Sequence, residues 1–89
     1  MYSVYIIYSQ KLDRYYVGST NDLDRRLHDH NRGKTPYSKN GLPWVLRYSE
    51  HFETRQEAVR REKEIKKKKS RKFIEALIGL SSAGSEHSA

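Results

Sequence analysis

The stretch YYVGSTNDLDRRLHDHN, residues 15–31, contains a predicted transition from a strand to a helix. The two tyrosines and the valine at its start favour a strand, and Gly18 favours a turn after it. Asn21 and Asp22 are residue types that cap helices, and the acidic residues that follow suit the positive end of the helix dipole. We therefore predict a helix that begins near Asn21 or Asp22 and ends near Asn31.

This predicted helix carries two polar side chains on its apolar side. Leu23, Arg26, Leu27 and His30 follow the i, i+3, i+4, i+7 spacing of one helical face. Arg26 and His30 are four residues apart, so their side chains are neighbours. One interpretation is that both lie at the edge of the apolar stripe and reach water. The other is that they converge on a functional site.

A strand precedes this stretch and pairs with its first residues. Residues 2–9, YSVYIIYS, are rich in β-branched and aromatic side chains and predict a strand. Because side chains alternate along a strand, Val4 and Ile6 share one face and Tyr5 lies on the other. A polar connection leads into the next strand, so residues 2–18 predict an antiparallel hairpin.

The chain after the first helix predicts a loop and a third strand. Residues 32–41, RGKTPYSKNG, contain two glycines, a proline and several polar residues, which predicts a loop. Residues 43–52, PWVLRYSEHF, have the apolar and alternating positions of a strand.

Two further helices follow the third strand. Residues 54–57, TRQE, have the spacing of a capping box, which predicts a helix that continues to about Lys67. A second helix is predicted to begin at Ser70 and to end at Gly79. The small polar residues 81–89 predict a disordered tail.

The order of these elements is β-β-α-β-α-α, which predicts an α+β fold in which helices pack on a small sheet. A chain of 89 residues predicts one domain, which we place at residues 1–80, with the tail outside it.

The composition favours a partner with negative charge. The net charge is +7 and the isoelectric point is near 9.8, so the surface attracts polyanions such as nucleic acid. The chain has no cysteine, which excludes disulfides and thiolate metal sites. No signal peptide and no apolar run long enough to span a bilayer are evident. We therefore expect a cytoplasmic protein without a membrane partner.

A carboxylate lies among apolar positions on the predicted helix after residue 54. Ala58 and Ile65 define an apolar stripe, and Glu62 lies between them. Burial of a lone carboxylate is costly, so such a group titrates, pairs or binds a metal. Pairing with Lys66, four residues on, or with Arg61 is the simpler interpretation.

Taken with the strand phenols of Tyr5 and Tyr16, these polar groups could act together on a phosphodiester. Arg26 could bind a phosphate oxygen and stabilise its developing charge. Glu62 could hold a hard divalent cation, Mg²⁺, which would stabilise the leaving oxygen. A phenol or the His30 imidazole could take a proton from water.

Two tripeptides extend this hypothesis to a known family. SVY, residues 3–5, and YVG, residues 16–18, resemble the paired motif of the GIY-YIG nuclease superfamily, with Ser3 in place of the first glycine. The family arginine lies eight residues after the second glycine, which is the position of Arg26. A histidine often follows four residues later, which is the position of His30. The chain is similar to the short stand-alone bacterial members.

The resemblance extends to the later helix and implies a fold and an activity. AVRREKEIK, residues 58–66, resembles the family segment whose glutamate holds the metal, which implies that Glu62 binds one Mg²⁺ or Mn²⁺ ion. The implied fold is a three-stranded antiparallel sheet flanked by helices. The implied activity is metal-dependent hydrolysis of DNA. In the implied mechanism Tyr5 or His30 helps to deprotonate water, and Tyr16 positions water or substrate.

The basic side chains outside this set predict contacts with nucleic-acid phosphates. The expected substrate is single-stranded, duplex or branched DNA, in repair or recombination and near the nucleoid, with a protein partner as a possible source of targeting. A nucleic-acid-binding module with little activity, and an RNA-binding or ribosome-associated protein, are the alternatives. The residues expected to contact phosphates are Arg25, Arg32, Lys34, Lys39, Lys66 and Lys67.

Overall fold

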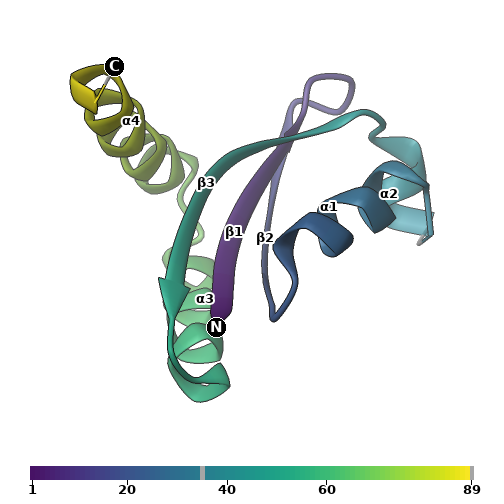
Figure 1. The fold of residues 1–89 in the computed structure, drawn as a ribbon. Coiled ribbons are helices and arrows are strands. Elements are labelled where there is room, and N and C mark those ends of the chain that lie inside the picture. Colours follow the sequence, from purple (N-terminus) through teal and green to yellow (C-terminus); the bar gives the residue numbers. More distant parts are fainter. Residues whose placement is uncertain (35, 89) are drawn as a thin grey trace.

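The computed structural model describes residues 1–34 and 36–88, with the side chains of residues 1–34 and 38–80. In chain order, two strands are followed by two helices, a third strand and two more helices (Figure 1). They are β1 (Tyr2–Ser9), β2 (Arg14–Thr20), α1 (Leu23–Asn31), α2 (Pro36–Asn40), β3 (Trp44–Phe52), α3 (Arg55–Lys68) and α4 (Arg71–Ser88).

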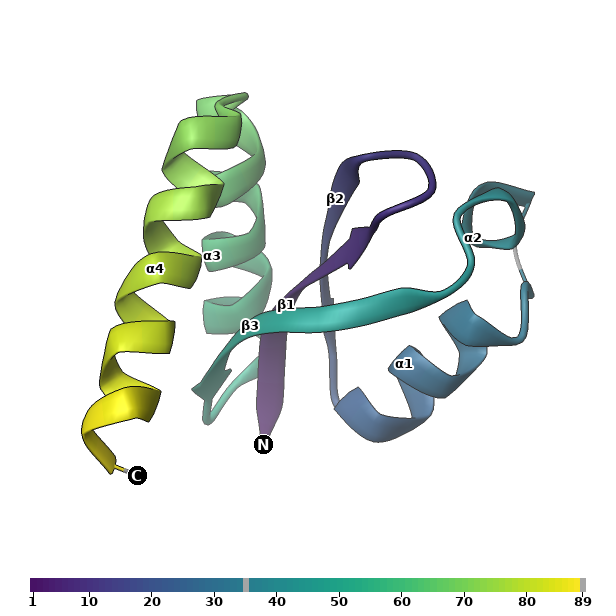
Figure 2. The same ribbon diagram turned by 90° about the horizontal axis from the view of Figure 1, so that it is seen from above.

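The three strands form one antiparallel sheet in the order β2-β1-β3. The central strand β1 pairs with β2 in a register that sets Tyr5 opposite Gly18 and Ile7 opposite Tyr16. Helices α1 and α2 lie on one side of the sheet, and α3 and α4 lie on the other (Figures 1 and 2). The predicted three-stranded antiparallel sheet flanked by helices is therefore confirmed.

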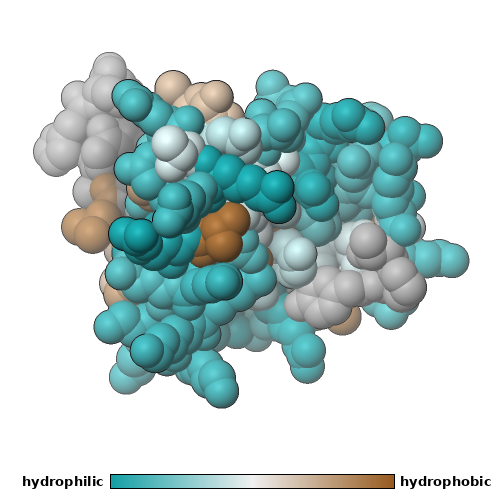
Figure 3. All heavy atoms as spheres, turned by 90° about the horizontal axis from the view of Figure 1, so that it is seen from below, coloured by the Kyte–Doolittle hydropathy of each residue, from teal (hydrophilic) through white to brown (hydrophobic). Residues whose placement is uncertain are grey.

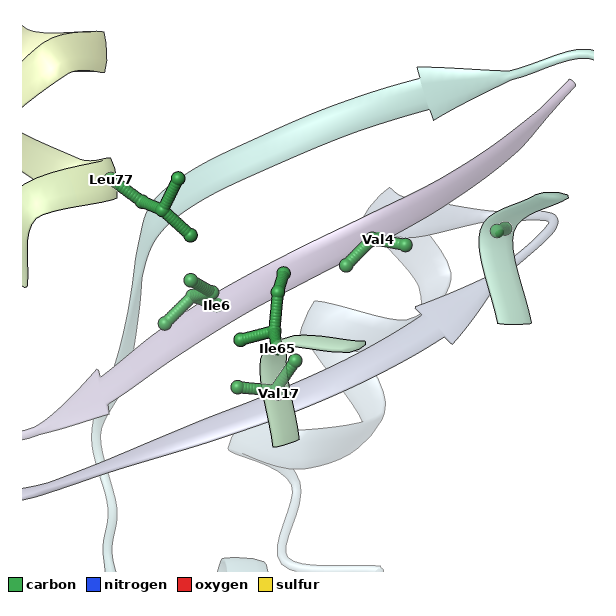
Figure 4. Close-up of a cluster of buried hydrophobic side chains, with 6 residues drawn as sticks. Val4, Ile6, Val17, Ile65 and Leu77 are labelled. Carbon is green, nitrogen blue, oxygen red and sulfur yellow. The ribbon is translucent and has the colours of Figure 1, made fainter. Parts of the chain in front are cut away.

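Alternation along the strands divides the apolar side chains between two clusters, one on each face of the sheet. The cluster under α3 and α4 is drawn in Figure 4 and contains Val4, Ile6, Val17, Ala58, Ile65 and Leu77. The cluster on the face of α1 contains the buried side chains of Tyr5, Ile7 and Trp44. Leu23 and Leu27 of α1 pack against this second cluster, as the apolar stripe of that helix predicts.

The helix starts follow the local signals in the sequence. Asp22 caps α1 through a hydrogen bond that its side chain accepts from the backbone N–H of Arg25. Thr54 and Glu57 form the predicted capping box at the start of α3. That helix ends at Lys68, one residue after the predicted end.

Two predictions about helix extent are wrong. The predicted loop contains the short helix α2, and the N–H of the Trp44 indole donates to the backbone carbonyl of Ser38 within it. Helix α4 does not end at Gly79 but continues to Ser88, because one glycine costs a helix interior only about 1 kcal/mol. The tail at residues 81–89 lies outside the residues whose side chains are described, and the domain boundary at residue 80 stays a prediction.

The face of the molecule in Figure 3 is mostly hydrophilic, with hydrophobic side chains in small separate patches. The charged fraction of 33% accounts for this surface. Among the described residues, no helix is both long enough and apolar enough to cross a bilayer.

Candidate active site

The centre of the candidate site is a buried contact between β1 and α1. Tyr5 is 2% exposed and His30 is 6% exposed, and a hydrogen bond of 3.1 Å joins the Tyr5 hydroxyl to His30 Nε2. Gly18 lies opposite Tyr5 on β2, and a Cβ atom there would come within 2.5 Å of the Tyr5 hydroxyl oxygen. The absence of a side chain at Gly18 therefore leaves the space that the Tyr5 ring occupies.

Tyr16 extends this centre toward the outer strand. Its ring centroid lies 4.9 Å from that of His30 and 6.3 Å from that of Tyr5. Trp44 closes the group from the start of β3, 6.3 Å from His30 and 6.4 Å from Tyr16. The prediction that Tyr5 and Tyr16 share one surface is consistent with these distances.

Asn31 fixes the position of Trp44, a role that its place at the predicted end of the first helix did not indicate. Its side-chain amide donates to the Trp44 carbonyl at 3.0 Å and its side-chain oxygen accepts from the Trp44 N–H at 2.6 Å. The two bonds tie the end of α1 to the start of β3. An asparagine at a helix end gave no sign of this partner, which lies 13 residues further along the chain.

Arg26 is exposed at the rim of the site, while His30 of the same helical face is buried. Arg26 therefore lies at the edge of the apolar stripe and reaches water, as one interpretation of the sequence predicted, whereas His30 does not. Arg26 lines a hollow of about 260 Å³ with Ser19, Thr20 and Arg55. It also lines a smaller hollow beside His30 and Lys34. A phosphate in either hollow would meet the Arg26 guanidinium.

Glu62 approaches the site from the opposite face of the sheet. Its carboxylate accepts hydrogen bonds from the Ser19 hydroxyl at 2.5 Å and from Lys66 Nζ at 2.6 Å, and its side chain is 19% exposed. The predicted pairing with Lys66 is confirmed, whereas Arg61 pairs with Glu50 and Glu64 instead.

Lys66 connects the two faces around the edge of the sheet. Its ammonium contacts Glu62 and also lies 5.9 Å from the centre of the Tyr16 ring. Tyr16 shares a face with Tyr5, and Ser19 is on the other face, since side chains alternate along β2. The candidate site is therefore built around the outer strand β2 rather than on one face.

The site changes the protonation equilibria of its groups. Burial raises the pKa of Tyr5 far above its usual range, the neighbouring Tyr16 adds to this, and Arg26 opposes it. Burial and the charge of Arg26 lower the pKa of His30. Burial raises the pKa of Glu62, but the hydrogen bonds from Lys66 and Ser19 outweigh it, so the pKa is lowered. At neutral pH the site thus holds a neutral phenol, a neutral imidazole and an ionised carboxylate.

A metal ion at this site would have one carboxylate ligand. Within the described part of the chain, no group of three or more histidines and acidic residues could hold a metal ion. Mg²⁺ is commonly bound by one or two carboxylates together with water and substrate phosphates. The ionised Glu62 fits that role once Lys66, whose side chain is half exposed, moves aside.

The side chains predicted to contact phosphates are exposed. Arg25 lies on α1 and Lys39 on α2, Arg32 and Lys34 lie between these helices, and Lys66 and Lys67 lie on α3. Lys34 pairs with Asp29 at 3.6 Å, and Lys66 pairs with Glu62. The exposed residues of the predicted set are Arg25, Arg32, Lys34, Lys39, Lys66 and Lys67.

Comparison with known proteins identifies the family of this chain. A family model described as the GIY-YIG catalytic domain matches residues 1–74. The chain belongs to the GIY-YIG family. The family is one of nucleases, so this domain has a nuclease fold and the corresponding kind of substrate is nucleic acid.

Relatives of this GIY-YIG domain carry the description UPF0213 protein. One from Halobacterium salinarum is 41% identical over 79 residues, which are 88% of this chain and the whole of that protein. One from Bacillus velezensis is 42% identical over 67% of this chain and 65% of its own length. The solution NMR structure of a UPF0213 protein from Bacillus halodurans has a TM-score of 0.56 at 35% identity, covering 90% of this chain and 85% of that one.

Proposed function

We propose that this protein is a metal-dependent endonuclease that hydrolyses phosphodiester bonds in DNA, with selectivity for structure or weak selectivity for sequence. The observation that carries the proposal is the meeting of Tyr5, Tyr16 and His30 with Glu62 around one edge strand, in a chain of the GIY-YIG family. A role in DNA repair or recombination fits such an activity.

Each side chain has a task that follows from its surroundings. Arg26 binds a nonbridging oxygen of the cleaved phosphate, since it is exposed and lines both hollows at the rim of the site. His30 is neutral at pH 7 because its pKa is lowered, so it can accept a proton. Tyr5 holds one imidazole nitrogen by its hydrogen bond, which leaves the other side of the ring to act.

Glu62 is the residue that would hold one Mg²⁺ or Mn²⁺ ion. When bound, such an ion stabilises negative charge on the leaving oxygen. The Ser19 hydroxyl orients the carboxylate by donating to Oε1. Lys66 Nζ donates to the other oxygen, Oε2. Lys66 must release this oxygen, and a nearby phosphate would draw its ammonium away.

A nucleic-acid-binding module with little activity is the second candidate. One observation favours it: both oxygens of Glu62 already have partners within the protein, so the carboxylate is satisfied without a metal. This candidate expects nucleic-acid binding that neither chelator nor substitution of Glu62 alters, and it expects no product. Binding of RNA in preference to DNA is a further outcome of the same binding measurement.

The test is cleavage of end-labelled single strands, duplexes, flaps and junctions by the wild type, Arg26→Ala and Arg25→Ala. Both arginines are exposed on α1, so Arg25→Ala is a matched control for the loss of a surface charge. The proposal expects a loss of at least about a hundredfold with Arg26→Ala, and of no more than about tenfold with Arg25→Ala, which removes one expected phosphate contact away from the cut phosphate. Equal losses, or intact cleavage by Arg26→Ala, would refute the role of Arg26.

A further inference from the structure

A second concave surface runs along the outer strand next to the candidate active site. It is a groove of about 480 Å³ between β2 and the residues that join α3 to α4. Its floor is apolar and consists of Val17, Ile65, Ile74 and Tyr15, all on the face of α3 and α4, while Tyr16 borders the groove from the other face at the edge of β2. None of the residue roles proposed above uses this groove, although Tyr16 and Lys66 line both it and the candidate site.

The rim of the groove is positively charged. Arg14, Lys66, Lys69 and Arg71 line it, and Asp13 is the acidic residue among the lining side chains. Arg71 neutralises that acid through an ion pair of 2.7 Å. Within the described residues, Arg14 and Lys69 take part in no ion pair, and Arg14 is exposed. The rim therefore presents unneutralised cations above an apolar floor.

The shape of the groove is maintained by contacts at its far end. Arg71 donates to the backbone and side-chain oxygens of Asp13 at 3.1 and 2.7 Å, and it lies 5.3 Å from the centre of the Tyr15 ring. The Tyr15 hydroxyl donates to Glu75. Lys69 adopts a left-handed backbone conformation, with φ of 47°, that ends α3 and turns the chain into α4.

We propose that this groove binds an unpaired nucleotide next to the phosphate that is cut. A nucleobase has the flat apolar faces that suit the apolar floor with its Tyr15 ring, and its flanking phosphates suit Arg14 and Lys69. A paired base cannot enter, because its edge and faces are taken up in the duplex. This inference rests on the proposed function for the position of the cut phosphate, and it assigns the substrate class: single strands, or branched structures with an unpaired base.

The test measures binding without divalent metal, so that cleavage does not contribute. The probes are a fluorescein-labelled twelve-nucleotide single strand and the corresponding blunt duplex, titrated by anisotropy in EDTA at several salt concentrations. The groove variant is Arg14→Ala/Lys69→Gly, in which glycine accepts the left-handed conformation at residue 69. The matched control is Arg60→Ala, which removes a cation from α3 at a hollow lined by Phe52, Glu57, Arg61 and Glu64.

The wild type is expected to bind the single strand more tightly than the duplex. The groove variant should lower the slope of log affinity against log salt for the single strand by about 0.7 per lost phosphate contact. It should leave the slope for the duplex as it is, and Arg60→Ala should change both probes alike. Equal weakening of both probes by the groove variant, or no weakening of either, would overturn the groove site.

A second measurement tests the floor. 2-Aminopurine placed in the single strand should lose fluorescence when it stacks on the Tyr15 ring. Tyr15→Leu keeps an apolar side chain against the neighbouring core and removes the ring, so affinity should fall by about tenfold and the quenching should weaken. Unchanged quenching and affinity in folded Tyr15→Leu would contradict stacking on Tyr15. If the groove variant cleaves DNA in Mg²⁺ with the substrate selectivity of the wild type, the groove site is refuted and the proposed nuclease activity is not.

Discussion

Substitution of Gly18 by alanine tests whether the Tyr5 ring is held as closely as the site requires. A Cβ atom at residue 18 would lie 2.5 Å from the Tyr5 hydroxyl oxygen and 2.7 Å from the ring carbon that bears it. The ring cannot withdraw freely, because Tyr5 is 2% exposed and hydrogen-bonded to His30. Forcing one extra methyl group into such a core typically costs about 1–3 kcal/mol.

The unfolding free energy of Gly18→Ala should therefore fall by about 1–3 kcal/mol. In a domain of this size each kcal/mol lowers the melting temperature by about 4–8 °C. Among the described glycines only Gly33 has a positive φ, so the cost at Gly18 is steric. The assays are urea unfolding by circular dichroism and thermal melting.

Two further variants make this test specific. Gly79→Ala is the control, because a Cβ atom there meets nothing within 4 Å, and alanine in a helix should stabilise by about 0.5–1 kcal/mol. Tyr5→Phe removes the atom closest to the new methyl group. The double variant Gly18→Ala/Tyr5→Phe should therefore lose less stability than the sum of the single changes. Wild-type stability of Gly18→Ala, or additive losses, would refute this account of the contact.

Three other predictions concern the groups around this centre. The pKa of His30 is lowered in the folded protein, so protonation below the unfolded-state pKa of about 6.5 favours unfolding, and His30→Gln should lose less stability on acidification than the wild type. Equal pH dependence of the two proteins in urea unfolding would contradict this. Asn31→Ala should cost about 1–3 kcal/mol and shift the emission of the single tryptophan, Trp44, to longer wavelength, because two backbone groups lose their partner; unchanged emission and stability would count against the tie. Because the Lys66 ammonium competes with a metal ion for Glu62, Lys66→Met should tighten Mn²⁺ binding, measured by electron paramagnetic resonance, while it changes stability by less than about 1 kcal/mol. A Mn²⁺ affinity equal to that of the control Lys67→Met would contradict this competition.

Local signals made part of the fold predictable. The capping box at Thr54 and the alternation along residues 2–9 depend on neighbours in the chain, and both are confirmed. The helix α2 and the passage of α4 through Gly79 were missed because the first depends on a tertiary contact and the second on a small local penalty. Propensity cannot weigh either of these effects.

The candidate site was partly predictable for the same reason. A histidine and a carboxylate at apolar positions pointed to His30 and Glu62, and the structure buries the first and half-buries the second. Ser19 and Asn31 were missed because their partners lie 43 and 13 residues away along the chain. A serine on a strand and an asparagine at a helix end give no local sign of such partners.

We propose above that Glu62 supports metal-dependent cleavage at this site. The most direct measurement is the rate of cleavage of end-labelled single-stranded and branched DNA with Mg²⁺, Mn²⁺ or EDTA, by the wild type and by Glu62→Gln of confirmed folding. Products are expected only with metal, and Glu62→Gln is expected to cleave at least about a hundredfold more slowly. Cleavage in EDTA, cleavage by Glu62→Gln at the wild-type rate, or no cleavage of any substrate by the metal-loaded wild type would contradict this proposal.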